Sequence, residues 1–108
     1  MKGKLGLMGK NHSDELYTPD EAFDVLKGFI PKDWIIFECA VGTFKLVNKM
    51  KKEGYRVQYT SSFFDSDVTG FYNVIITNPP YSQKDKFLQR CYELKKPFAL
   101  LMPITALE

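Results

Sequence analysis

Four short runs rich in β-branched and aromatic residues constrain the fold of this chain more than any other feature. They lie at residues 34–39, 56–60, 73–77 and 98–102. Most of their residues are apolar, without the strict alternation that marks a strand with one wet face. Segments with helical spacing of apolar residues separate them, and strands joined in this way form a parallel sheet covered on both faces. The pattern predicts an α/β domain with about four parallel strands and flanking helices.

The helices are predicted at residues 19–30, 43–54 and 83–96. The first has a clear start, because Thr18 is a good N-cap and Pro19 suits the first helical position. Glu21 completes a capping box with Thr18. The preceding stretch has three glycines, scattered lysines and no period. We therefore expect residues 1–16 to form a loosely ordered arm and residues 17–108 to form the domain.

Composition limits the classes of function. The chain has 108 residues, of which 44% are apolar and 26% charged, as in one ordinary globular domain. Its net charge is only +2, so nucleic-acid binding would need a local site. The longest apolar runs are too short to span a bilayer, which argues against a membrane partner. Cys39 and Cys91 form no CxxC and are expected to be free thiols in the cytoplasm. No group of residues has metal-ligand spacing.

The sequence Asn-Pro-Pro-Tyr follows the third apolar run, at the strand end where α/β sheets collect ligands. A turn that simply ends the strand is the plain interpretation. Proline has no N–H, however, so the carbonyl groups here have no donor beside them. The Asn78 amide oxygen and the Pro79 carbonyl can together accept both hydrogens of one exocyclic amine. Such contacts favour a pyramidal nitrogen with a free lone pair, and Tyr81 can stack on the base, a contact worth about 1–3 kcal/mol.

These residues resemble the catalytic motif of the amino-methyltransferases, which move a methyl group from S-adenosylmethionine to adenine N6 or cytosine N4. The segments "YTPDEAFDVL", "FECAVGTFKLV" and "KPFALLMPITALE" are similar to segments of the adenine-N6 members, in the same order. The resemblance covers residues 17–108 and implies a Rossmann-like methyltransferase sheet. Because the family's sheets continue for several more strands, this one is expected to be truncated, with residues 56–60 and 98–102 at its edges.

The resemblance also implies roles for individual residues. The catalytic residues would be Asn78, Pro79, Pro80 and Tyr81. The residues that bind S-adenosylmethionine would be Thr18, Pro19, Glu38, Ala40, Gly42 and Asp65. Lys84 and Lys86 lie close to this motif and are expected to meet the phosphates of a nucleic acid, although the wet face of a helix explains them as simply.

Two positions depart from the family's pattern. The family's cofactor loop usually reads GxG, whereas this chain has Gly42-Thr43-Phe44. The Phe44 ring is expected where the backbone must approach the cofactor, or packed into the core of the following helix. Replacing it by glycine is then expected to raise cofactor affinity. The second strand should end in an acidic residue that holds the ribose, but Ser61 falls there, so Asp65 or Asp67 would have to substitute.

Three functions remain open. The departures favour a degenerate copy that no longer transfers methyl groups and acts as a binding or inhibitory module. Its partner would be a nucleic acid or a protein, for example as a viral or prophage product in the host cytoplasm. The alternatives are an active adenine-N6 methyltransferase on DNA or RNA, and a fragment without its own role. Uncovered sheet edges further predict a homodimer, or a complex with another protein, through residues 97–108.

Overall fold

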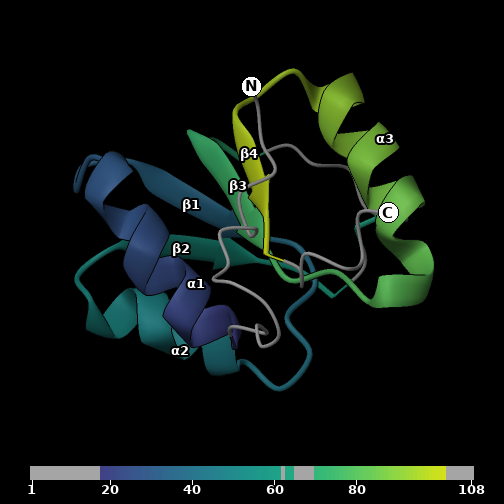
Figure 1. The fold of residues 1–108 in the computed structure, drawn as a ribbon. Coiled ribbons are helices and arrows are strands. Elements are labelled where there is room, and N and C mark those ends of the chain that lie inside the picture. Colours follow the sequence, from purple (N-terminus) through teal and green to yellow (C-terminus); the bar gives the residue numbers. More distant parts are fainter. Residues whose placement is uncertain (1–17, 62, 65–69, 102–108) are drawn as a thin grey trace.

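The centre of the protein is one sheet of four parallel strands (Figure 1). The structure is a computed structural model that describes residues 18–61, 63–64 and 70–101, so the arm at 1–16 lies outside it. The strands are β1 (Ile35–Glu38), β2 (Arg56–Tyr59), β3 (Val74–Thr77) and β4 (Phe98–Leu100). Their order, β2-β1-β3-β4, places β2 and β4 at the edges. The prediction of a parallel α/β sheet with a Rossmann-like arrangement is therefore confirmed. Pairing of its edges with a second chain stays a prediction.

Helices cover both faces of this sheet. They are α1 (Pro19–Leu26), α2 (Lys45–Lys52) and α3 (Lys84–Leu94), with short 3-10 turns η1 (Lys27–Phe29) and η2 (Tyr81–Gln83). In Figure 1, α1 and α2 lie on one side of the sheet and α3 lies on the other. Successive strand residues face opposite sides, so Ile76 packs with α1 and α2 while Ile75 packs with α3. This two-sided burial explains why the central strands are apolar without alternation.

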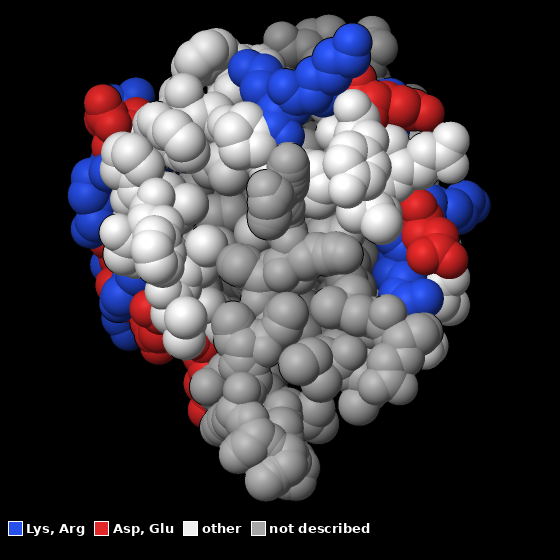
Figure 2. Space-filling model, turned by 45° about the horizontal axis from the view of Figure 1, so that its top comes forward, with Lys and Arg blue, Asp and Glu red and all other residues white. Residues whose placement is uncertain are grey.

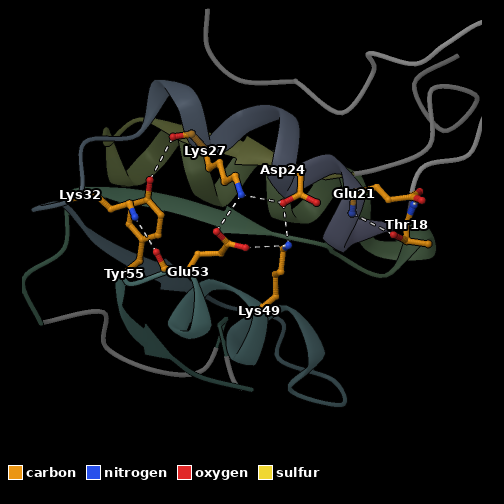
Figure 3. A network of polar contacts seen from close by, with 8 residues as sticks. All are labelled: Thr18, Glu21, Asp24, Lys27, Lys32, Lys49, Glu53 and Tyr55. Carbon is orange, nitrogen blue, oxygen red and sulfur yellow. Dashed lines mark hydrogen bonds and ion pairs between the residues drawn. The ribbon is translucent and has the colours of Figure 1, made fainter.

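The first turn of α1 is fixed by the predicted capping box. The Glu21 backbone N–H donates to Thr18 Oγ1 at 3.1 Å, and the Thr18 N–H donates to Glu21 Oε1 at 2.9 Å (Figure 3). Pro19 occupies the first helical position, where its missing N–H costs nothing. The capping box therefore sets where α1 begins and which way its first residues face.

Charged side chains join α1 to α2 (Figure 3). Lys49 on α2 lies 2.8 Å from Asp24 on α1, and Lys27 lies 2.9 Å from Glu53. The Tyr55 hydroxyl also donates a hydrogen bond to the Ile30 carbonyl at 2.8 Å. Each exposed ion pair adds little stability, but together they hold the two helices in one alignment. No helix in the described ranges is long and apolar enough to cross a bilayer.

Candidate functional site

A pocket of about 520 Å³ opens at the carboxyl ends of β1 and β3. The residues after β1, the first residues of α1 and the residues after β3 form most of its wall. This is the place where open α/β sheets bind ligands. The volume also lies within the range of about 300–1,000 Å³ typical of small-molecule sites.

The motif after β3 contributes three residues to this wall, Asn78, Pro79 and Pro80. The Pro80 carbonyl accepts the Gln83 N–H at 2.9 Å, which starts the turn into α3. Within the described residues, no such bond involves the Pro79 carbonyl or the side-chain amide of Asn78. Tyr81 does not line the pocket, and its side chain is 65% exposed. Among the described residues, these two acceptors at the pocket wall are therefore unused, and the exposed ring of Tyr81 follows them in the chain.

Glu38, the last residue of β1, is only 1% exposed and also lines the pocket. Its Oε2 accepts the Thr77 hydroxyl hydrogen and, at 3.3 Å, the Ala40 N–H. Its Oε1 is buried and has no hydrogen-bond partner among the residues that the structure describes. Burial raises the pKa of Glu38 above its usual range, although the Thr77 hydroxyl and the nearby backbone N–H groups of Ala40 and Asn78 oppose this. A buried carboxylate oxygen without a partner is costly, so a donor from a ligand would be well placed here.

Thr77 and Asp20 are among the residues of this site that the sequence analysis did not single out. Thr77 ends the apolar β3 strand, and its hydroxyl orients Glu38 across the sheet. Asp20, the second residue of α1, lines the pocket and has a buried Oδ1 without a partner. A hydroxyl inside an apolar strand next to the Asn-Pro-Pro motif was a usable signal for Thr77. No such signal in the sequence marked Asp20, because acidic residues are common in the first turn of any helix.

Four of the six cofactor-binding residues that the resemblance implied line the pocket. Pro19, Glu38, Ala40 and Gly42 line the pocket, whereas Thr18 is exposed and its side chain is used in the capping box. Asp65 and Asp67 lie outside the described residues. Ser61 does line the pocket just beyond β2, at the position where the resemblance implied an acidic residue.

The Phe44 ring lies in neither of the two places predicted for it, beside the cofactor or in the core of the following helix. Its side chain is 41% exposed, does not line the pocket and packs edge-on against Tyr59 of β2, with ring centroids 5.2 Å apart. The reason lies in the backbone. The Phe44 N–H donates to the Val41 carbonyl at 2.8 Å, and Phe44 itself has φ of 68°. It therefore adopts the left-handed conformation that glycine would supply, and α2 begins only at Lys45 rather than at residue 43.

This geometry changes the expected effect of replacing Phe44. Phe44→Ala should destabilise the protein by about 1 kcal/mol, because it removes the ring contact with Tyr59 and keeps the left-handed strain. Phe44→Gly loses the same contact but relieves the strain, so its stability should lie closer to the wild type. Urea unfolding of the two variants measures this difference. Equal stabilities of the glycine and alanine variants would contradict the proposed strain at residue 44.

Aromatic side chains form part of the pocket wall, and two lysines lie near aromatic rings outside it. Phe64 and Phe87 line it, with ring centroids 5.0 Å apart, and form an apolar wall. Lys86 lies 5.4 Å from the Phe64 ring centre, and Lys84 lies 5.3 Å from that of Tyr81. Neither lysine lines the pocket itself. On the face in Figure 2, Lys and Arg lie at the margins, next to acidic residues in several places, and no basic patch crosses the described part of this face.

The two cysteines are buried thiols with raised pKa values. Cys39 and Cys91 are both free and buried, as expected. Burial raises the pKa of Cys39, which also lines the pocket, and raises that of Cys91 to about 12. Both thiols therefore stay protonated near neutral pH. In the part of the chain that the structure describes, no three His, Cys, Asp or Glu side chains gather as a metal site would require.

Comparisons with known proteins add no relative to this picture. The chain matched none of the protein-family models, curated proteins or solved structures with which it was compared. Function must therefore be inferred from the pocket itself.

Proposed function

We propose that this chain is an amino-methyltransferase-type domain that binds S-adenosylmethionine and presents the N6 amine of adenine to it. One observation carries the proposal. Glu38, with an unpartnered buried oxygen, and the Asn78-Pro79 acceptors line the same pocket at the ends of neighbouring strands. An amino-acid ammonium group and an exocyclic amine are the two donor groups that these acceptors fit best.

The residues around the pocket fit the cofactor. Glu38 Oε1 would accept a hydrogen bond from the ammonium group, because charge-assisted bonds satisfy a buried carboxylate best. Phe64 and Phe87 offer an apolar wall for an aromatic base. Gly42 has φ of 52° and allows the loop after β1 to turn beside the pocket. When bound, S-adenosylmethionine supplies an electrophilic methyl group.

The chain's own part in the reaction is to hold the amine. The Asn78 amide oxygen and the Pro79 carbonyl accept its two hydrogens and favour a pyramidal nitrogen, whose lone pair is then free to attack. Tyr81 is exposed and can stack on the adenine ring, with the charge of Lys84 beside it. Reaching this site requires the base to leave its stack, so single-stranded DNA or RNA is the easier substrate.

The position of Phe44 removes one sequence-based argument against this function. Its ring lies outside the pocket, and its backbone takes the conformation that a glycine would take. A cofactor loop of ordinary shape is therefore compatible with this unusual residue. This is why we prefer an active domain to the degenerate copy that the sequence favoured.

The second candidate function is a binding module that has lost methyl transfer. Ser61 favours it, since this residue lines the pocket where an acidic side chain would hold the two ribose hydroxyls. A serine hydroxyl makes fewer and weaker bonds to a ribose than a carboxylate does. Such a module would use the same surface to hold a nucleic acid or a protein without reacting with it.

Two measurements test these functions in order. Calorimetry of the whole chain with S-adenosylmethionine should show binding to one site, and no heat at millimolar ligand would contradict both the pocket assignment and the proposed activity. Transfer of a tritiated methyl group to adenine-containing single strands should follow if the first candidate is right. Cofactor binding without transfer to single- or double-stranded DNA or RNA would support the module.

A further inference from the structure

We propose that Asp20 is a second residue of the pocket that recognises a positive charge of the cofactor. The pocket would then prefer the sulfonium form, S-adenosylmethionine, over its thioether product. This inference rests on the proposed function and specifies the chemistry of the same site. Its starting point is the unpartnered, buried Oδ1 of Asp20 at the pocket wall.

Asp20 and Glu38 reach the pocket from different elements. Asp20 is on the first turn of α1, whereas Glu38 ends β1 in the sheet. Each leaves one buried carboxylate oxygen without a hydrogen-bond partner. Glu38 already accepts bonds from Thr77 and Ala40 on its other oxygen, which fixes its place. Because both residues line this pocket, it holds two separate carboxylates, each with one buried oxygen that no described residue satisfies.

The capping box positions Asp20. Thr18 and Glu21 exchange two hydrogen bonds around it, and Pro19 fixes the backbone just before it. The side chain of Asp20 is left out of this arrangement, although an acidic residue in the first helical turn often bonds to free N–H groups. A side chain held at a pocket wall by a rigid turn and left without a partner is well placed to meet a ligand.

One positive residue balances these two carboxylates. Lys45 lines the pocket and is the first residue of α2. A lysine is unfavourable at a helix N-terminus, where the helix dipole is also positive, so this end of α2 attracts an anion. No ion pair of Lys45 with another described residue is found.

The pocket charges mirror those of one ligand. Two carboxylates and one ammonium group match a ligand with two positive charges and one negative charge. S-adenosylmethionine carries an ammonium, a sulfonium and a carboxylate. Its thioether product, S-adenosylhomocysteine, lacks the sulfonium charge and leaves one carboxylate of the pocket without a counter-charge. Because Glu38 fits the ammonium, the sulfonium charge is assigned to Asp20. The arrangement would favour release of the product after each transfer.

Calorimetry with both ligands on the whole chain tests this assignment. The wild type should bind S-adenosylmethionine about tenfold more tightly than S-adenosylhomocysteine. Asp20→Asn keeps the shape and removes the charge. We expect it to lose about tenfold in affinity for S-adenosylmethionine and to change by less than about twofold for the thioether. The exposed Asp33, in the turn before β1 and outside the pocket wall, provides Asp33→Asn as a control that should change neither affinity.

The outcomes separate this inference from the proposed function. If the wild type binds neither ligand, the proposed function and the assignment both fall. If it binds both ligands but Asp20→Asn weakens them equally, Asp20 acts only through the fold, and the inference is overturned while the function stands. An unchanged preference in Asp20→Asn also overturns it. Thermal melting of the free variants identifies any loss of folding, and the thioether affinity serves as an internal control.

Discussion

Replacing Glu38 by glutamine is expected to weaken binding of S-adenosylmethionine about 10- to 150-fold, while making the free protein more stable at neutral pH. The loss of affinity follows because the variant cannot form a charge-assisted hydrogen bond with the ammonium group, a contact worth about 1.5–3 kcal/mol. Glutamine keeps one oxygen that can accept the bonds from Thr77 and Ala40. The variant therefore changes charge more than shape.

The gain in stability follows from the raised pKa of Glu38, which is mainly due to burial. An unfolded glutamate ionises at about pH 4.3, whereas the folded protein holds its proton to higher pH. Below the unfolded pKa both states are protonated, so wild type and variant should differ little. As pH rises through the folded pKa, the wild type must ionise a buried group and loses stability that the neutral variant keeps.

Melting temperatures of both proteins between pH 4 and pH 8 measure this difference. The advantage of Glu38→Gln over the wild type should be smallest at pH 4 and should grow with pH. Glu93→Gln is a matched control, because Glu93 is exposed and pairs with Arg90 at 3.6 Å, a surface contact of little energy. A constant difference across this pH range would show that Glu38 does not titrate as its burial implies.

Much of the fold could be predicted because local and global signals agree. The strand Val74–Thr77 is buried along its whole length, as expected for a parallel sheet covered on both faces. Thr18 and Glu21 predicted the start of α1 because a capping box needs only residues three apart. The edge of the sheet that carries the pocket could also be predicted, since the carboxyl ends of parallel strands lie together and bind ligands.

Phe44 and Asp20 could not be predicted, for different physical reasons. The apolar spacing of Phe44 with Val47 suits a buried helical residue, but the hydrogen bond to Val41 sets a left-handed backbone and turns the ring towards Tyr59. Asp20 looks like any acidic residue in a first helical turn. Its proposed role depends on sharing a pocket with Glu38 of β1, eighteen positions further along the chain, and spacing within α1 carries no information on that arrangement.

Replacing Asn78 by alanine is expected to reduce methyl transfer by about 10²–10³-fold. The reason is that Asn78 supplies one of the two acceptors proposed to hold the amine, and alanine leaves only the Pro79 carbonyl. The side chain of Asn78 makes no hydrogen bond with the other described residues and is exposed, so folding should change little. Affinity for S-adenosylmethionine should stay within a few-fold of the wild type, because Glu38 and Asp20 are intact.

Two further variants make the interpretation specific. Asn78→Asp keeps an acceptor oxygen at the same position, so it should transfer methyl groups faster than Asn78→Ala. Asn48→Ala is a matched control, since Asn48 is exposed on α2 and does not line the pocket. Single-turnover transfer of a tritiated methyl group to an adenine-containing single strand, at saturating cofactor, measures the chemical step for each protein. If Asn78→Ala transfers as fast as Asn48→Ala, the amide does not hold the amine. The catalytic assignment of the Asn-Pro-Pro motif would then be wrong even with a working cofactor pocket.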